Sequence, residues 1–368
     1  MKKVLVGMIC DGKAGGIDKY LLNFYESVKT EDIKIDFLTN KRDESLAEYL
    51  KANGSELFEV ASLMHPVLQY RQVKEIINSN GYDIVYMNIS TALTFPSLLA
   101  ARSCGVKKVI AHSHTSGYDC ENGVKRCIFT ALHYLLRGLV RKSANSYLCC
   151  SDVAAEWMFG KKAANVCEVI YNAVDTSKFS FSQEKRDEIR KELGIEDKFV
   201  IGNVGNVCYQ KNHKFLIDAF YELQKTEPDA VLVIIGDGVL MPKLKAQIAK
   251  YGIEEKVKLL GRLDASRGYM SAFDVFALPS NFEGLGIVFI EAQYTHTPCV
   301  ASDRVPRLAG ISNMISFVPL RTKDWALAIS GYKNVNREDF VFDCGDNFDL
   351  SKQKEQLGLI LDLNEVAK

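Results

Sequence analysis

Two glutamates at a fixed spacing in one glycine-rich segment form the most informative pattern in the chain. Glu283 and Glu291 are separated by seven residues within PSNFEGLGIVFIEA, residues 279–292. A glycine-rich loop that runs into an apolar helix places Glu283 in the loop and Glu291 about one turn into the helix. A glutamate among such apolar neighbours is costly unless it is hydrogen-bonded, and the hydroxyls of a ribose or a sugar supply such bonds. For one such glutamate alone, the alternative is an exposed helix face.

A lysine follows a second apolar strand. In NVGNVCYQKNHKFLIDAF, residues 203–220, an apolar strand ends at Gly205, a polar loop carries Lys211 and Asn212, and a helix follows. A lysine in such a loop is a natural partner for a phosphate, and a hydrogen bond to a charged group contributes about 1.5–3 kcal/mol. The alternative is a solvated surface lysine, which is the ordinary state of this residue type.

Two histidines follow a strand in the N-terminal half of the chain. His112 and His114 stand in AHSHTS, residues 111–116, and alternation puts both on one face if the strand continues. A metal site would need a third ligand, and no residue is suitably spaced to supply it. The open alternatives are a structural hydrogen bond and a hydrogen bond to a sugar hydroxyl.

The first predicted strand leads into a glycine-rich loop, CDGKAGGID. Gly12, Gly15 and Gly16 precede a helix that begins near Ile17. Backbone N–H groups at a helix N-terminus bind anions, whereas the alternative is a tight turn that needs glycine for its backbone angles. The spacing differs from G-x-G-x-x-G, so a dinucleotide fingerprint is absent.

These residues need a scaffold that brings strand ends together, and the hydrophobic pattern predicts one. Apolar runs separated by amphipathic helical stretches indicate parallel sheets covered on both faces. A polar, charge-rich stretch interrupts the rhythm, so two doubly wound units joined near residues 172–198 are the simplest account. Ligands bind beyond the carboxyl ends of such strands, and we expect those ends to line one shared cleft. Strands are predicted at residues 4–9, 34–38, 83–87, 109–112, 147–150, 168–170, 199–203, 230–235, 257–260, 274–278 and 299–302.

Length and composition exclude several other classes of protein. At 368 residues, two domains are expected. The chain has 46 basic and 46 acidic residues, which argues against a nucleic-acid binder. Ten cysteines include no C-x-x-C pair, and scattered thiols fit a reducing cytoplasm. The N-terminal apolar run is too short for a signal peptide, and no apolar run is long enough to span a membrane.

A basic segment stands out in this otherwise neutral chain. Residues 102–162 contain ten basic and four acidic residues. Within it, VKRCIFTALHYLLRGLVRK mixes apolar and basic residues at helical spacing, which is typical of a helix on an anionic membrane surface. Arg137, Arg141 and Lys142 are the candidates for that contact. The alternative is a core-packed helix with solvated basic side chains.

Taken together, these segments resemble the retaining GT-B glycosyltransferases of family four, and the resemblance covers nearly the whole chain. The specific element is the E-x7-E pattern, Glu283 to Glu291. The other similar segments, in the same order as in the family, are GGIDKYLLNFY, AHSHTS, YNAVDTSKF, YQKNHKFLIDAF and LVIIGDGVLMPKLK. The segment Gln210 to His213 is most similar to capsule and exopolysaccharide transferases.

The resemblance implies a role for each matching residue. Glu291 would hold the ribose of a nucleotide sugar, and Glu283 would bind hydroxyls of the transferred sugar. Lys211 would pair with the diphosphate, and His114, or as second choice His112, would be the histidine of the active site on the acceptor side. The remaining donor-binding positions are Gly15, Gly16, Asn206, Arg262, Leu263, Gly284, Leu285, Gly286 and Ile287.

One position departs from the family pattern. After the glycine in GNVGN the family usually has an arginine, which supplies a second cation to the diphosphate, and here that position is Asn206. Arg262, Arg304 and Arg307 are candidates to replace it. The chain has no D-x-D, so we expect no metal and no other cofactor; fixed amides, helix dipoles and Lys211 would stabilise the leaving diphosphate.

The resemblance implies an enzyme with two Rossmann-like α/β domains facing a central cleft. The acceptor-side domain would span residues 1–175, with a helix at about 350–368 packing back onto it, and the donor-binding domain residues 176–349. We expect transfer from a UDP-sugar to a glycan or lipid-linked acceptor in bacterial surface polysaccharide synthesis. The location expected is the cytoplasm, with peripheral contact to the inner face of an anionic membrane. The alternatives are a GT-B-type sugar-nucleotide epimerase and a non-catalytic sugar-nucleotide-binding homologue.

Overall fold

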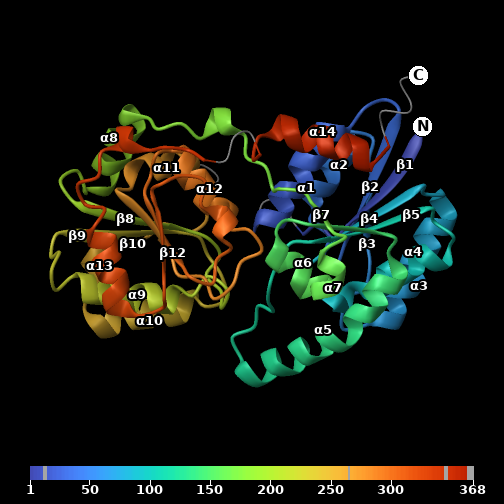
Figure 1. The fold of residues 1–368 in the computed structure, drawn as a ribbon, viewed down its shortest axis with the longest axis horizontal. Coiled ribbons are helices and arrows are strands. Elements are labelled where there is room, and N and C mark those ends of the chain that lie inside the picture. Colours follow the sequence, from blue (N-terminus) through green and yellow to red (C-terminus); the bar gives the residue numbers. More distant parts are fainter. Residues whose placement is uncertain (11–14, 264–265, 344–346, 363–368) are drawn as a thin grey trace. The chain divides into compact units, whose positions relative to one another are not determined.

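The computed structural model describes residues 1–10, 15–263, 266–343 and 347–362 of the chain. The chain divides into two units (Figure 1). The N-terminal unit comprises residues 1–118 and 122–173, together with the chain from residue 347 onward. The C-terminal unit comprises residues 119–121 and 174–346.

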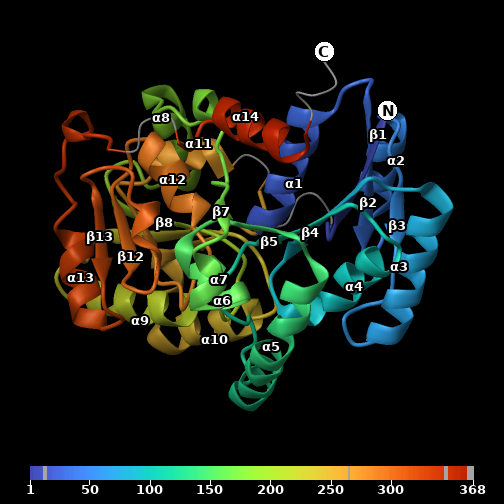
Figure 2. The same ribbon diagram turned by 45° about the vertical axis from the view of Figure 1, so that its right-hand side comes forward.

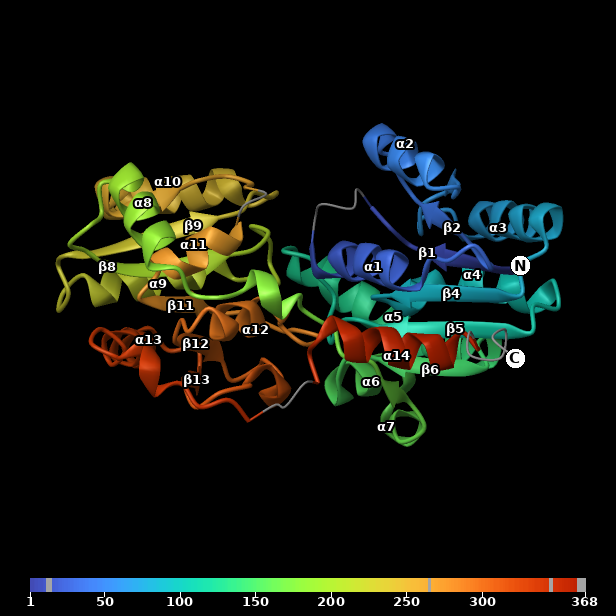
Figure 3. The same ribbon diagram turned by 90° about the horizontal axis from the view of Figure 1, so that it is seen from above.

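The N-terminal unit is built on a parallel sheet of seven strands in the order β3-β2-β1-β4-β5-β6-β7. Figure 3 shows β2, β1, β4, β5 and β6 as successive ribbons. The strands are β1 Lys2–Gly7, β2 Ile33–Thr39, β3 Leu57–Glu59, β4 Ile84–Ile89, β5 Lys108–Ser113, β6 Ser146–Cys149 and β7 Glu168–Val169. The helices are α1 Gly15–Val28, α2 Glu44–Ala52, α3 Pro66–Asn80, α4 Phe95–Ser103, α5 Gly123–Ser143, α6 Asp152–Phe159, α7 Lys161–Ala164 and α14 Leu350–Ile360.

Alternate residues of β1 belong to different cores, so both faces of this sheet are covered. Val4 and Val6 pack into a core with α1, α2 and α14. Leu5 packs into a second core with α3, α4 and α6. The last helix therefore lies on the first unit, against α1 (Figure 1), and Leu357 is one of its core residues.

The C-terminal unit repeats this plan with six parallel strands in the order β10-β9-β8-β11-β12-β13, of which Figure 3 labels β9, β8, β11, β12 and β13. The strands are β8 Phe199–Val204, β9 Ala230–Ile235, β10 Val257–Leu259, β11 Val275–Leu278, β12 Cys299–Ser302 and β13 Ile315–Val318. The helices are α8 Gln183–Leu193, α9 His213–Leu223, α10 Met241–Tyr251, α11 Ser266–Ala272, α12 Ile287–Tyr294 and α13 Thr322–Ser330. Alternation again divides each strand between two cores: Leu232 faces α9 and α10, whereas Val231 and Val233 face α8, α11 and α12.

A carboxylate joins the charge-rich stretch before β8 to this second sheet. Asp274 binds the guanidinium of Arg190 on α8 at 2.6 Å and also accepts the backbone N–H of Val200 at 2.7 Å. Arg186 binds the other oxygen of the same carboxylate. The polar stretch therefore belongs to the C-terminal unit, because its basic residues are bonded there.

The prediction of two doubly wound α/β units is confirmed. The predicted strands match the observed ones, with small shifts at their ends. The sequence missed β3 and β13, which are the outermost strands of their sheets at one side. β3 has three residues and β13 is half-exposed along its length, so neither carries the buried apolar run that marks the inner strands.

Candidate functional site

Each sheet has one point at which the strand order reverses, between β1 and β4 in the N-terminal unit and between β8 and β11 in the C-terminal unit. In the C-terminal unit, β8 lies next to β11. The loops after these strands, residues 205–212 and 279–286, contain Lys211 and Glu283. Helices leave such neighbouring strands in opposite directions, and the crevice left between them is where α/β sheets bind ligands.

Lys211 and Glu283 form an ion pair across this reversal point. The Lys211 Nζ lies 2.7 Å from Glu283 Oε1. The same carboxylate accepts hydrogen bonds from Ser280 Oγ at 2.6 Å and from Gln210 Nε2 at 3.1 Å. Glu283 is only 4% exposed, and these donors compensate the cost of burying its charge. Both residues were predicted from the sequence as site residues, but their contact with each other was not.

The two loops are also tied together through their backbones. The Asn281 N–H donates to the carbonyl of Gln210 at 2.7 Å, and its side-chain amide donates to the carbonyl of Tyr209 at 2.8 Å. The Asp119 carboxylate accepts the Gln210 N–H at 2.9 Å. Asp119 is distant in the sequence and belongs to no motif, so nothing in the sequence marks it.

The loop that carries Glu283 ends at a helix N-terminus. Gly286 is the N-cap of α12 with a φ of 88°, and a Cβ there would lie 3.0 Å from the Phe289 ring, so glycine is needed. No side chain caps this helix end among the described residues. The amides of Leu285, Gly286 and Ile287 therefore lie where a helix N-terminus favours an anion.

Glu291 lies in α12, about one turn after its start. It is 6% exposed, although its neighbours in the helix are apolar and buried. Its burial and that of Glu283 fit the predicted hydrogen-bonding role of the pair. Gly284 is also buried, in the loop before α12.

Asn206 lies exposed in the loop after β8. The three arginines that are candidates to replace the cation at this position differ in their contacts. Arg304 donates to Asn281 Oδ1 at 3.2 Å, next to the loop of Glu283. The Arg307 guanidinium instead packs over the Phe317 ring at 4.3 Å. Arg262 is exposed after β10, followed by the half-buried Leu263.

In the N-terminal unit, the two predicted histidines belong to a network of neutral side chains. The rings of His112 and His114 lie 3.9 Å apart. Tyr86 OH is bonded to His112 Nδ1 and to Tyr20 OH, each at 2.6 Å. Burial lowers the pKa of His114 to about 3, and burial together with the adjacent His114 lowers the pKa of His112 well below its ordinary value. Both imidazoles are therefore neutral near pH 7.

The hydrogen bonds of Asn88 determine which His114 nitrogen carries the proton. Asn88 Nδ2 donates to the Gly7 carbonyl, so Asn88 Oδ1 accepts from His114 Nε2 at 2.7 Å. His114 Nδ1 then remains an acceptor. Within the described residues, neither this atom nor His112 Nε2 makes a well-directed hydrogen bond, although an interaction with the Asn172 side chain partly offsets the lowering of the His114 pKa. A ligand hydroxyl is a suitable donor to His114 Nδ1.

Gly15 and Gly16 are the first two residues of α1. The preceding part of the predicted anion-binding loop, residues 11–14 with Gly12, lies outside the described residues.

The basic segment forms α5, and the apolar side chains rather than the basic ones dominate its outer face. Val124, Ile128, Leu132, Leu135 and Leu139 are all exposed, and their spacing of three or four residues places them on one stripe. The opposite side of the helix is buried through His133 and Val140. Figure 2 shows α5 at the lower edge of the N-terminal unit.

The three basic residues predicted for a membrane surface lie in different environments. Arg137 is half-buried, with its guanidinium 4.9 Å from the centre of the Tyr134 ring. Arg141 donates to the Phe159 carbonyl at 3.2 Å, and Lys142 is exposed. Arg137 therefore takes part in the packing of the helix, and its contact with a membrane surface stays a prediction.

In the described part of the chain, no three or more histidine, cysteine, aspartate or glutamate side chains gather in a way that would hold a metal ion. No helix among those same residues has the length and apolar character that crossing a bilayer requires.

Two family models match most of the chain between them. The model described as Glycosyltransferase Family 4 matches residues 14–178, and the model described as Glycosyl transferases group 1 matches residues 185–314. The putative glycosyltransferase EpsF of Bacillus subtilis (strain 168) is 28% identical over 313 residues, which cover 82% of this chain and 78% of EpsF.

Two other similar proteins have more specific names. The UDP-Gal:alpha-D-GlcNAc-diphosphoundecaprenol alpha-1,3-galactosyltransferase of Escherichia coli is 28% identical over 300 residues, 78% of this chain and 76% of that protein. The crystal structure of Anabaena HepE in complex with UDP-glucose superposes with a TM-score of 0.78, covering 99% of this chain and 100% of HepE at 19% identity. Its fold is therefore shared. On the family models, the named relatives and this common fold, the chain belongs to the family four glycosyltransferases, which are enzymes of the GT-B type.

Proposed function

We propose that this glycosyltransferase transfers a sugar, with retention of anomeric configuration, from a UDP-sugar to a glycan or lipid-linked acceptor in bacterial surface polysaccharide synthesis. The observation that carries the proposal is the Lys211–Glu283 pair in the loops that meet at the β8–β11 reversal point, one of which leads into the α12 N-terminus. A cation and a helix N-terminus are the two devices that bind a diphosphate without a metal. The name of the E. coli relative, which includes a UDP-sugar and a diphosphoundecaprenol acceptor, and the UDP-glucose in HepE support the choice of donor and acceptor.

Lys211 and Glu283 then act as a unit. An ammonium group has three N–H bonds, so Lys211 can bind a phosphate oxygen while it stays bonded to Glu283. A carboxylate accepts several hydrogen bonds, and in this proposal Glu283 accepts one from a hydroxyl of the transferred sugar. Glu283 thus orients both the cation and the sugar, and Glu291 binds the ribose hydroxyls.

The reaction needs no metal in this proposal. The bond from the anomeric carbon to the diphosphate oxygen breaks, and the acceptor oxygen bonds to the same face of that carbon. The acceptor proton passes to the departing phosphate. The α12 amides and Lys211 stabilise the negative charge that develops on the diphosphate, because they are already directed at its position.

On the side of the N-terminal unit, His114 accepts a hydrogen bond from a substrate hydroxyl through Nδ1. The neutral network around His112 holds the His114 ring in place. A neutral acceptor is suited to a hydroxyl, whereas a protonated histidine would require an anion.

The proposed contact with an anionic membrane rests on α5. Its exposed apolar stripe can enter the interfacial region of a bilayer, and Lys125 and Lys142 at its two ends can bind lipid phosphates. Replacing Leu135 and Leu139 with serine should abolish binding to vesicles of anionic lipid, whereas Leu327→Ser, at an exposed leucine of the C-terminal unit, should not. Equal binding by all of these proteins would reject the membrane contact.

A thermal-shift panel of UDP- and GDP-sugars tests the donor. A ligand present at 100 times its dissociation constant stabilises the protein by about 2.7 kcal/mol. We expect Glu291→Ala to lose this shift with the UDP-sugar that binds, and Glu283→Ala to keep much of it while transfer slows. Glu222→Ala, which removes a surface partner of Lys225, is the matched control. No shift with any nucleotide sugar would overturn the donor assignment, and the reverse pattern would exchange the two roles.

The product distinguishes the remaining alternatives. A retaining transferase gives a glycoside with the donor's anomeric configuration, which the proton NMR coupling of the anomeric hydrogen reports. An epimerase would instead convert the donor to an isomeric sugar nucleotide without an acceptor.

A further inference from the structure

Gln210 precedes Lys211 in the loop after β8 and is bonded to the ion pair of the proposed donor site. Its backbone is fixed on two sides: the carbonyl accepts the Asn281 N–H at 2.7 Å, and the N–H donates to the Asp119 carboxylate at 2.9 Å. Its side-chain Nε2 donates to Glu283 Oε2 at 3.1 Å. Three hydrogen bonds therefore hold this glutamine in one position.

The Glu283 carboxylate determines how the Gln210 amide is oriented. An ionised carboxylate can only accept hydrogen bonds, so the NH₂ group of the amide faces Glu283 and the amide oxygen, Oε1, does not. Gln210 Oε1 makes no hydrogen bond among the described residues, and it keeps access to solvent because the side chain is only half-buried. An accessible acceptor therefore remains beside Glu283.

The two oxygens of the Glu283 carboxylate have different neighbours. Lys211 Nζ and Ser280 Oγ bind Oε1, at 2.7 and 2.6 Å, whereas Gln210 Nε2 binds Oε2. A phosphate is attracted to the cation, whereas an amide, which has no net charge, is suited to a hydroxyl. The carboxylate of Glu283 and Oε1 of Gln210 thus offer acceptors for two neighbouring hydroxyl groups.

We propose that Gln210 determines donor specificity: its Oε1 accepts a hydrogen bond from a hydroxyl of the transferred sugar, next to the hydroxyl that Glu283 binds. This inference rests on the proposed function, in which Glu283 binds the transferred sugar. The substrate class that it implies is a sugar with two free neighbouring hydroxyls. A donor that lacks the second hydroxyl leaves the amide oxygen without its partner and is discriminated against.

Monodeoxy analogues of the donor test this contact. The parent is the nucleotide sugar that gives the largest thermal shift, and each analogue lacks one hydroxyl of the transferred sugar. For the analogue without the hydroxyl that Gln210 binds, kcat/KM of the wild-type protein should fall roughly tenfold, the loss of about one hydrogen bond. Gln210→Leu should slow the parent donor roughly tenfold more than it slows that one analogue, because the analogue already lacks the contact.

Uniform slowing of the parent and of every analogue by Gln210→Leu would overturn the proposal, because it would show only a structural role beside Glu283. If Gln210→Leu does not fold, Gln210→Asn, which keeps the amide but withdraws it by one methylene group, allows the same comparison. Absence of nucleotide-sugar binding by the wild-type protein would instead overturn the proposed function, and the role of Gln210 with it.

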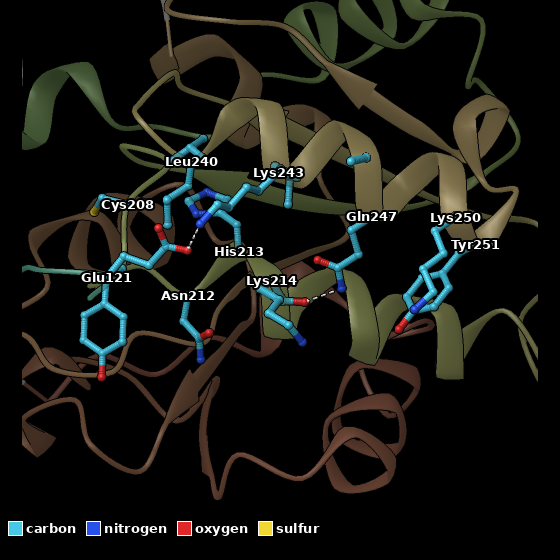
Figure 4. A pocket seen from close by; sticks show the side chains of 14 residues that line it. Glu121, Cys208, Asn212, His213, Lys214, Leu240, Lys243, Gln247, Lys250 and Tyr251 are labelled. Carbon is cyan, nitrogen blue, oxygen red and sulfur yellow. Dashed lines mark hydrogen bonds and ion pairs between the residues drawn. The ribbon is translucent and has the colours of Figure 1, made fainter. Parts of the chain in front are cut away.

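Gln247 supplies a matched control in the same unit. It lies on α10, and its Nε2 also donates to a carboxylate, that of Asp218, at 2.7 Å, and to the Lys214 carbonyl at 3.0 Å (Figure 4). Together with His213 it lines a cavity of about 590 Å³, and Glu283 is not among the lining residues. Gln247→Leu should change kcat/KM less than about twofold for every donor. An equal change of selectivity in this variant would contradict the proposal.

The backbone bond to Asp119 gives an independent check. Asp119→Ala removes the acceptor of the Gln210 N–H without altering the Gln210 side chain, so discrimination against the same deoxy analogue should weaken by roughly threefold. Asp119→Asn retains an acceptor oxygen and should restore it. If Asp119→Ala changed the preference at a different hydroxyl, the assignment of that contact to Gln210 would be wrong.

Discussion

The reversal points of the two sheets have the same topology but opposite chemistry. In the C-terminal unit, the loops after β8 and β11 carry a buried ion pair and lead into a helix N-terminus. In the N-terminal unit, Tyr86 and Asn88 on β4 form a neutral network with His112 and His114 at the end of β5. A charged crevice is suited to a diphosphate and a neutral one to hydroxyls, so similar strand plans present different chemistry in the two units.

Loss of the cation should produce the largest effect. Lys211→Ala leaves the Glu283 carboxylate buried without its charged partner and removes a donor to the diphosphate. Since removing one donor to a developing negative charge lowers the rate by about 10²–10³, we expect kcat/KM to fall roughly a hundredfold to a thousandfold in an assay of nucleotide release. Lys225→Ala, at an exposed lysine just after α9, should have little effect. If both variants were equally active, the charged character assigned to this crevice would be wrong.

Lowering the pH should destabilise the two units to different extents, because they contain different numbers of buried histidines. His114 and His213 have pKa values of about 3 in the folded protein and about 6.5 when unfolded. The unfolded state therefore binds more protons between these values, so the stability present above pH 6.5 is lost as the pH falls towards 3. Each buried histidine contributes roughly 1 kcal/mol per pH unit in this window.

The N-terminal unit has more such groups and should unfold first. In addition to His112 and His114, it contains His133, whose pKa burial lowers to about 4. The chain has two tryptophans, Trp157 in the N-terminal unit and Trp325 in the C-terminal unit. Fluorescence of Trp325→Phe and Trp157→Phe variants on acid titration reports each unit separately. If the Trp325 signal were lost at a higher pH than the Trp157 signal, the expected order of unfolding would be wrong.

A smaller effect is expected from the residue that orients His114. Asn88→Ala removes the acceptor of the Nε2 proton, so the ring can adopt either tautomer and its position becomes less defined. We expect roughly a tenfold lower kcat/KM, the loss of about one hydrogen bond, and a mixture of tautomers in the nitrogen NMR spectrum of the ring. An unchanged tautomer would show that the surrounding packing, rather than Asn88, holds the proton in place.

Arg304 gives the smallest of these effects. If it contributes the positive charge that Asn206 does not, Arg304→Ala should weaken UDP binding by about threefold to tenfold, the effect of a partly exposed charge. Arg307→Ala, whose side chain packs on Phe317, is the matched control. Titration with UDP measures both variants, and a larger effect at Arg307 would reverse the assignment.

The inner strands could be predicted because they are buried on both faces and therefore read as continuous apolar runs. The short edge strands β3 and β13 could not, because half-exposed residues lack that pattern. The candidate site residues were visible for a related reason. Lys211, Glu283, His112 and His114 are polar residues that stand directly at or after apolar strands.

The pairing of these residues was a different problem. Lys211 and Glu283 are 72 positions apart, and only the adjacency of β8 and β11 brings them into contact. Asn88 lies opposite His112 in the register of β4 and β5 and binds His114. Arg137 illustrates a further limit of the sequence: helical spacing alone does not predict which side of α5 is packed and which is exposed.

By itself, the sequence determined which segments are strands, which residues follow them and which family the motifs resemble, because burial and glycine content are written along the chain. Tertiary structure decided which of those residues bind each other and which of them stay neutral. It also decided that His213 is buried beside a cavity, since strand order and desolvation depend on neighbours far away in the sequence.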